Sequence, residues 1–397
     1  MQKKLTVITA LLLLVMAFQF CKKTKSNTTT TPTYAAIKAA FGANIDPTNL
    51  ANYANQAKPA YINKDNTGSN AITNTKATLG RVLFYDKNLS IDNSVSCGSC
   101  HRQEFAFGDT ALQSKGVSGG LTGRHSMRLI NARFAVEAKF FWNERAATLE
   151  AQTTQPIQDH AEMGFSGQSG RPTFATLVAK LTAIPYYTEL FQFVYGDATI
   201  TEPRMQECMA QFVRSIQSFD SKYDAGRALV ANDGQAFPNF TAQENTGKNL
   251  YLTPPNFDAT SNRISGGVGC NGCHNAPEFD IDPNTRNNGI IGTIGSPTLD
   301  LLNTRAPTLR DLAKPNGQPN SPMMHTGVIA TLQAAIGHYG TINIAPGNNN
   351  LDARLRPNGI GQKLNLTAPE VNALIAFLQT LTGSNVYTDA KWKSPFL

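Results

Sequence analysis

The sequence predicts a mainly α protein built from two helical lobes that are joined by long irregular loops. Three observations predict this class. Apolar residues recur at helical spacing in several segments that begin with capping residues. Loops rich in Gly, Asn and Pro separate these segments, at residues 253–269, 282–298 and 343–361. A C-x-x-C-H motif occurs twice, at residues 97–101 and 270–274, which is far enough apart for one motif in each lobe.

The start of the chain has the features of an export signal. Residues 1–21 combine a basic start with an apolar run that ends near Phe20. The Cys21 that follows predicts a lipoprotein acylated on this residue, and ordinary cleavage a few residues later is the alternative. In either case we expect an exported, periplasmic protein, tethered to a membrane if Cys21 carries a lipid. Residues 22–34 are Thr-rich without apolar periodicity, which predicts a disordered tether.

The composition is that of a globular chain with room for two domains. It has 397 residues, of which 41% are hydrophobic and 16% charged. The formal net charge of +7 is spread along the chain without a basic stretch interleaved with aromatic residues, which argues against a nucleic-acid partner. No later apolar run reaches the roughly 18–20 residues of a spanning helix. We expect one domain at residues 35–235 and a second at 236–397.

Capping residues place three helices. The segment at 201–219 has Thr201 as N-cap and Pro203 in its first turn. Its apolar face comprises Met205, Met209, Phe212, Val213 and Ile216. Cys208 lies in the same helix and is expected to be a buried spare thiol.

Two further helices begin with capping boxes. Thr241 pairs with Glu244, and Thr367 pairs with Glu370. The helix after Thr367 carries an apolar stripe and is expected to end at Gly383. The stripe consists of Val371, Leu374, Ile375 and Leu378.

The repeated C-x-x-C-H motif is the attachment sequence of c-type haem. Both thiols add to the haem vinyl groups, and the adjacent imidazole becomes the proximal iron ligand. A zinc ribbon would keep its cysteine pairs roughly 15–20 residues apart and needs no His after each pair, and structural disulfides need none either. The sequence therefore predicts two covalently bound c-type haems in two cytochrome-c-like domains. The attaching residues are Cys97, Cys100 and His101 in the first motif, and Cys270, Cys273 and His274 in the second.

Several blocks, taken in order, resemble the bacterial diheme cytochrome c peroxidases, the family that includes the diheme enzyme maturing methylamine dehydrogenase. The resemblance extends from about residue 75 to 381. The blocks are LGRVLFYDKNLSIDNSVSCGSCH, LINARF, FFWNERAATLEAQTTQPIQDHAEMGF, RSIQSFDSKYD, GCNGCH, RAPTLRDLAKPNGQPNSPMMHTG and TLQAAIGHYG.

The resemblance implies a division of labour between the haems. In this family the N-terminal haem binds and reduces hydrogen peroxide, and the C-terminal haem passes electrons to it. Trp142 falls at the position between the haems and would relay electrons. Gln152, Pro156 and Glu162 fall at positions that line the peroxide pocket. A partly desolvated Glu162 carboxylate could move a proton from the inner to the outer peroxide oxygen.

The axial ligand of the second haem is implied by the same resemblance. In the peroxidases a Met lies fourteen residues after the His of a P-x-M/F-H-x-G block, whereas here His325 leads to Tyr339. The maturation enzyme has a Tyr at this place, and a phenolate stabilises ferric and higher oxidation states. The resemblance favours Tyr339, with His338 as the alternative. Met323 and Met324 are expected to pack in the core.

Two departures from the family bear on the first haem. Many family members carry a ligating His in the segment that corresponds to residues 109–123, and this chain has none there. We therefore expect a five-coordinate first haem. His125 stands where the family commonly has a calcium-binding Asn, which puts calcium in doubt even though carbonyls of Asn320 and Pro322 remain as ligands. His125 could instead fill the space, bond a haem propionate or bind the first iron.

The leading hypothesis is an exported diheme peroxidase that takes electrons from a small exported donor, a cytochrome or a copper protein. A second is a protein-modifying oxidase that uses peroxide to oxidise a Trp or Tyr of a partner protein, which Tyr339 favours. A third is a non-catalytic diheme electron carrier, against which Glu162 and the missing distal His argue. The sequence leaves a homodimer open.

Overall fold

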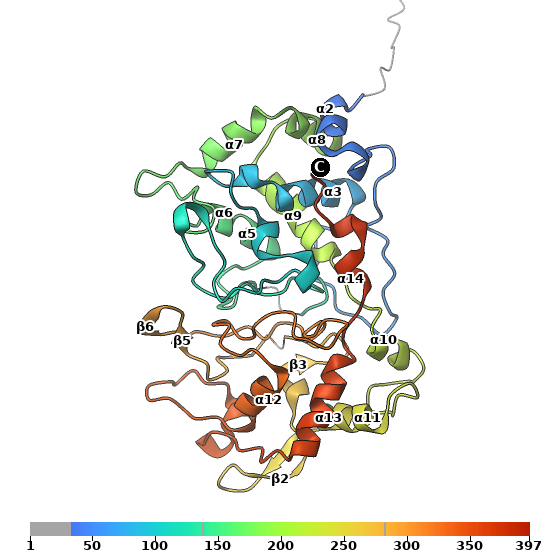
Figure 1. The fold of residues 1–397 in the computed structure, drawn as a ribbon, viewed down its shortest axis with the longest axis vertical. Coiled ribbons are helices and arrows are strands. Elements are labelled where there is room, and N and C mark those ends of the chain that lie inside the picture. Colours follow the sequence, from blue (N-terminus) through green and yellow to red (C-terminus); the bar gives the residue numbers. More distant parts are fainter. Residues whose placement is uncertain (1–32, 137–138, 282) are drawn as a thin grey trace, which may run out of the picture. The chain divides into compact units, whose positions relative to one another are not determined.

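The computed structural model describes residues 33–136, 139–281 and 283–397 (Figure 1). Helices and irregular loops make up most of this part of the chain, as the sequence predicts. The expected signal peptide and nearly all of the expected tether lie outside the described residues. Among the residues that are described, none of the helices is both long and apolar enough to cross a membrane. The account below concerns residues 36–397, which form one compact unit.

The helices fall into two groups by length, and the strands pair into short antiparallel ribbons. The longer helices are α2 (Ala35–Phe41), α3 (Asn74–Tyr85), α7 (Phe174–Thr182), α8 (Pro185–Tyr195), α9 (Glu202–Ser215), α11 (Ala242–Leu252), α12 (Leu332–Gly340) and α13 (Ala368–Gln379). The shorter ones are α4 (Cys97–Cys100), α5 (Leu149–Thr153), α6 (Gln155–Gln158), α10 (Lys222–Arg227) and α14 (Asn385–Thr388). The ribbons are β1 (Pro255–Phe257) with β2 (Arg263–Gly266), β3 (His274–Asn275) with β4 (Asp280–Ile281), and β5 (Gly292–Thr293) with β6 (Ser296–Leu299).

The predicted helix starts are confirmed, and one predicted helix end is wrong. The side chain of Thr201 caps α9, and reciprocal capping boxes start α11 and α13. However, α13 ends at Gln379 rather than near Gly383, because the amide and hydroxyl of Thr380 both bond to the carbonyl of Phe377. Gly383 has another role. A Cβ at this position would lie 2.3 Å from Asp220 Oδ1, so only glycine permits this close approach.

The two long helix pairs repeat one packing arrangement. Where α3 crosses α9, a Cβ on Gly80 would lie 2.0 Å from the carbonyl oxygen of Cys208. Where α11 crosses α13, a Cβ on Gly247 would lie 1.9 Å from the carbonyl oxygen of Ala373. One turn further along the second helix of each pair stands a phenylalanine whose Cβ would be 2.9 Å away, Phe212 in α9 and Phe377 in α13. In the sequence, each C-x-x-C-H motif follows the first helix of one pair. The two motifs therefore each lie next in the chain to a helix pair of the same packing.

Two clusters of buried apolar side chains accompany these crossings. The first includes Phe84 and Phe212, and the second includes Tyr251 and Phe377. Neither cluster is built from one continuous half of the sequence. Tyr223 belongs to the second cluster, whereas the last segment returns to the first. Figure 1 shows α14 of that segment beside the elements of the first cluster. The domain boundary at residues 235 and 236 stays a prediction.

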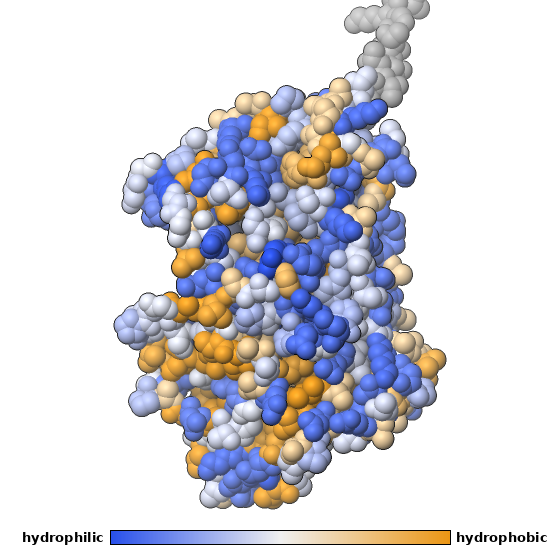
Figure 2. All heavy atoms as spheres, in the orientation of Figure 1, coloured by the Kyte–Doolittle hydropathy of each residue, from blue (hydrophilic) through white to orange (hydrophobic). Residues whose placement is uncertain are grey.

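The surface mixes polar and apolar residues. Figure 2 shows apolar side chains gathered around β5 and β6 on the face that it presents. Leu299 at the end of β6 is 56% exposed, and Leu302 just beyond it is 53% exposed. Asp300 lies between these two leucines in the sequence, and its ion pair with Arg124 joins this region to the segment that carries His125.

Candidate active site

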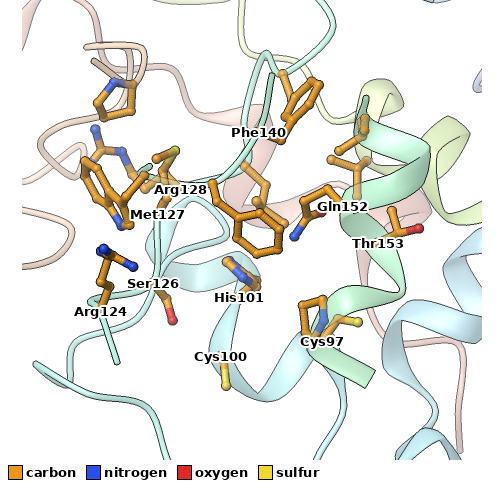
Figure 3. Close-up of a pocket in the computed structure, with 18 of the residues that line it drawn as sticks. Cys97, Cys100, His101, Arg124, Ser126, Met127, Arg128, Phe140, Gln152 and Thr153 are labelled. Carbon is orange, nitrogen blue, oxygen red and sulfur yellow. The ribbon is translucent and has the colours of Figure 1, made fainter. Parts of the chain in front are cut away.

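The first C-x-x-C-H motif folds as a single helical turn. Ser96 and Ser99 form a capping box at the start of α4, and the amide of His101 donates to the carbonyl of Cys97 at 2.9 Å. One turn of helix brings the side chains of Cys97, Cys100 and His101 to one cavity of about 450 Å³ (Figure 3). A cavity of this size is in the range of small-molecule and cofactor sites.

The second motif opens onto a cavity of its own. Cys270 begins a short 3-10 turn, which Gly269 precedes with a left-handed φ of 69°. Cys270, Cys273 and His274 line a cavity of about 530 Å³. Burial raises the pKa of both the Cys97 and the Cys270 thiols to about 12. Because the pairs face separate cavities, they are not arranged to share one zinc ion.

The two motif imidazoles are oriented as iron ligands require. His101 Nδ1 donates to the carbonyl of Phe107 at 3.0 Å, and His274 Nδ1 donates to the carbonyl of Pro307 at 3.0 Å. A carbonyl only accepts, so each ring carries its proton on Nδ1 and keeps the lone pair of Nε2 free. Burial lowers the pKa of both rings, to about 4 for His274, which holds them neutral. The residues of both cavities therefore fit covalently attached haems.

The expected peroxide-pocket residues come together at the first cavity. Gln152 of α5, Pro156 of α6 and Glu162 from the loop after α6 all line it. Figure 3 shows the side chains of Gln152 and His101 in the same pocket. The structure thus brings these three residues together at the cavity of the first motif.

Glu162 is held by its own loop. Asp159 Oδ1 accepts the amide of Ala161 at 2.8 Å and that of Glu162 at 3.0 Å. Burial, followed by the Asp159 charge, raises the pKa of Glu162 to about 7, and the Arg145 charge opposes both effects. The carboxyl is therefore half-buried at the cavity and titrates near neutral pH, unlike a fully solvated surface charge.

One wall separates the two cavities, and Trp142 is part of it. Eight residues line both cavities: His125, Ser126, Met127, Arg128, Trp142, Arg305, Ala306 and Pro307. The Trp142 indole is 9% exposed, and its Nε1 donates to the carbonyl of His125 at 2.7 Å. Its position between the two motif cavities is the one that an electron relay requires.

His125 lies in this wall, and one of its two ring nitrogens forms no hydrogen bond with the described residues. Its Nδ1 donates to the carbonyl of Ala111 at 2.8 Å, and its buried Nε2 has no hydrogen-bond partner within the described ranges. Burial lowers the pKa of this imidazole, which favours the neutral form. A neutral Nε2 lone pair can bind iron or accept a hydrogen bond, but it cannot donate one to a propionate.

The candidate ligands of the second iron differ in how they lie relative to the second cavity. Tyr339 lines it, and its hydroxyl accepts a hydrogen bond from the Asn288 amide at 3.2 Å. His338 is already bonded, with Nε2 2.9 Å from the Asn288 carbonyl. His325 is absent from the lining of both cavities among the residues described. Met324 also faces the second cavity, and its sulfur accepts from the same Asn288 amide. Burial raises the pKa of the Tyr339 phenol.

Sequence reasoning missed three polar residues of these cavities. Arg128 faces both, Asp280 faces the first from β4, and Asn288 faces the second. None of the three belongs to a motif identified in the sequence. In the part of the chain that is described, no three His, Cys, Asp or Glu side chains form a metal-binding group, but the carbonyls of Asn320 and Pro322 are ligands of another kind.

Comparisons with known proteins agree with this geometry. Residues 74–229 match the family model described as di-haem cytochrome c peroxidase. The chain is 29% identical to the methylamine utilization protein MauG of Methylophilus methylotrophus, covering 79% of this chain and 84% of that protein. It is 26% identical to the cytochrome c551 peroxidase of Nitrosomonas europaea, covering 77% and 80%. A solved MauG-like protein associated with microbial copper homeostasis superposes with a TM-score of 0.63 at 28% identity, covering 86% of this chain and 99% of that one.

Proposed function

Because the chain belongs to the di-haem cytochrome c peroxidase family, we propose that it reduces hydrogen peroxide to water at the haem of the first cavity, with electrons relayed through the haem of the second. Each peroxide takes up two electrons and two protons and yields two water molecules. One observation carries the proposal: two C-x-x-C-H motifs face two cavities that share a single wall, and Trp142 lies in that wall.

Bound haem would supply an iron atom that accepts a peroxide oxygen and changes its oxidation state. Cys97 and Cys100 would hold the first haem, with His101 as the iron ligand. Cys270, Cys273 and His274 would do the same for the second. The hydrogen bonds from the two imidazoles to backbone carbonyls fix the ring orientations and make Nε2 a better donor to iron.

Glu162 is the group that moves the proton. Cleavage of the O–O bond needs a proton carried from the inner oxygen to the outer one, so that water can leave. A carboxyl with a pKa of about 7 can both take and give this proton at neutral pH. Gln152 and Pro156 line the same space, where the Gln152 amide can hydrogen-bond the bound peroxide and the Pro156 ring excludes water.

Trp142 is the electron relay. Its indole faces both cavities, and the hydrogen bond to the His125 carbonyl fixes the ring plane. Electrons would arrive from a small exported donor, a cytochrome or a copper protein. Export of the chain to the periplasm, with Cys21 as a lipid anchor, belongs to the same proposal and matches the compartment in which c-type haem is attached.

A second candidate function is a protein-modifying oxidase, and the placement of Tyr339 favours it. The Tyr339 hydroxyl lies in the second cavity, with a donor amide from Asn288 beside it. As a phenolate ligand it would stabilise the oxidised second haem and weaken this haem as an electron source. Oxidising equivalents would then be stored for a Trp or Tyr of a partner protein.

The deciding experiment uses the haem-loaded chain with a reduced small cytochrome c as donor. A peroxidase oxidises two equivalents of the donor for each peroxide consumed and returns to its starting spectrum. A protein oxidase instead reacts with peroxide promptly, keeps the oxidising equivalents, and oxidises the donor more slowly than a peroxidase would. If the haem-loaded protein shows no reaction with peroxide, both functions are refuted.

A further inference from the structure

Arg128 is a buried cation in the wall between the two cavities. Its side chain is 9% exposed and lines both cavities. Nη2 donates to the carbonyl of Thr308 at 3.1 Å, while Nε has no hydrogen-bond partner in the described part of the chain. Gly108 makes the room for its aliphatic stem, since a Cβ there would lie 3.0 Å from Arg128 Cγ.

The protein gives this cation no ion-pair partner. Within the residues that the structure describes, no carboxylate forms a salt bridge with Arg128. The groups that favour its charge at longer range are Tyr387 and Asp311. Asp311 does not form a salt bridge with Arg128: its Oδ1 accepts the amide of Gly383 at 2.9 Å and the hydroxyl of Tyr387 at 3.0 Å, and its Oδ2 has no hydrogen-bond partner among the described residues. A buried guanidinium without a counter-ion is costly, so an anion is expected against it.

We propose that Arg128 binds the propionate carboxylates of the haems and that its positive charge raises their reduction potentials. The inference rests on the proposed haem attachment. A haem carries two propionates, and the planar fork of a guanidinium matches the geometry of a carboxylate. Arg128 lines both cavities while its Nε is buried without a hydrogen-bond partner among the described residues, so a propionate in either cavity can supply the missing acceptor.

Arg128 is linked to the second motif through two adjacent backbone carbonyls. Arg128 donates to the carbonyl of Thr308, and the preceding carbonyl, that of Pro307, accepts from Nδ1 of His274. A positive charge beside an iron ligand favours the reduced, less positive metal. Arg128 therefore raises the potential of the second haem.

The test compares three variants of the full haem-loaded chain. Arg128→Gln removes the charge, and Arg128→Lys keeps the charge but loses the fork. Arg133→Gln is the matched control, because Arg133 pairs with Asp65, lines neither cavity, and its loss changes the net charge equally. Haem staining first establishes that each variant carries both haems. Spectroelectrochemical titration then gives both reduction potentials.

Arg128→Gln should change the ratio of oxidised to reduced second haem at least tenfold at a fixed potential, a downward shift of about 59 mV for one electron. The first haem should shift in the same direction, and Arg133→Gln should shift neither. Unchanged potentials in Arg128→Gln with both haems attached overturn the proposal.

Arg128→Lys keeps the test decisive if the Gln variant loses haem. It should leave the potentials close to those of the wild type while changing the propionate bands in the resonance Raman spectrum. Unchanged propionate bands overturn the proposal. A wild-type protein that carries both haems but does not consume peroxide refutes the proposed function and leaves the measurement of potentials intact.

Discussion

The indole Nε1 of Trp142 donates a 2.7 Å hydrogen bond to the backbone carbonyl of His125. This bond ties the only tryptophan that lines both cavities to the segment that forms the wall between them. The other tryptophan, Trp392, packs in the first apolar cluster and lines neither. The two tryptophans therefore supply a proposed relay residue, Trp142, and its matched control, Trp392.

Trp142→Phe should keep both haems and slow the exchange of electrons between them at least tenfold, because the ring that spans the wall becomes smaller and loses its anchoring bond. Stopped-flow spectra after addition of peroxide measure how fast the second haem responds. Trp392→Phe should leave this rate near that of the wild type. An unchanged rate in Trp142→Phe would remove Trp142 from the electron path.

Glu162→Gln should keep both haems and slow the reaction with peroxide by ~10²–10⁴-fold, the usual contribution of general acid–base catalysis. The control is Glu207→Gln, because Glu207 pairs with Lys76 on the surface and lines neither cavity. The second-order rate constant from stopped-flow mixing is the measurement. A Gln variant as fast as the control would assign Glu162 a structural role.

The same carboxyl sets a pH dependence. Its pKa is about 7, and it must be ionised to take the first proton, so the rate should rise with pH through about 7 and then level off. Asp159→Asn removes the neighbouring negative charge that helps to raise this pKa and retains an oxygen for the two loop amides. The inflection should then move to lower pH. A profile that is flat in the wild type speaks against Glu162 as the titrating group.

Tyr339→Met should raise the reduction potential of the second haem, because a thioether favours ferrous iron and a phenolate favours ferric iron. The variant should also lose any long-lived retention of the second oxidising equivalent at that haem, which Mössbauer spectra of peroxide-treated protein report. His338→Gln should change neither, since His338 Nε2 is occupied by a backbone carbonyl. A large spectral change in His338→Gln, with none in Tyr339→Met, would assign His338 rather than Tyr339 as the ligand of the second iron.

The fully oxidised protein should react with peroxide without prior reduction. Residues 102–124 contain no His that could occupy the sixth position at the first iron. Ferric electron paramagnetic resonance spectra should show one high-spin and one low-spin haem. Two low-spin haems, with the high-spin signal restored in His125→Ala, would identify the bare Nε2 of His125 as a ligand.

Replacement of all four motif cysteines by Ser should abolish the haem signal on a denaturing, haem-stained gel, since thioether bonds alone survive denaturation. Cys208→Ala is the control, because Cys208 is buried in α9 beside the Tyr195 hydroxyl and away from both motifs. Any signal that survives in the fourfold variant refutes covalent attachment at these positions.

Local signals in the sequence predicted the parts of the structure that depend on neighbouring residues. The caps at Thr201, Thr241 and Thr367 were predictable because each involves side chains within three residues of the helix start. The end of α13 was not, since Gly383 is required by its contact with Asp220, more than a hundred residues away. Spacing and resemblance assigned the motif residues and Tyr339. They could not reveal Arg128, because the absence of a counter-ion appears only once distant segments have come together.

The return of the last segment to the first cluster affects the order in which the chain can fold. Val386 and Trp392 are core members of the first cluster, and Gln103, two residues after the first motif, donates to the carbonyls of Val386 and Asp389 at 3.0 Å. A chain made from its N-terminus has completed the second cluster, which ends at Leu381, before these residues exist. The lobe that begins first is thus finished last. Until then the segment that carries Cys97 lacks part of the apolar cluster that packs against it.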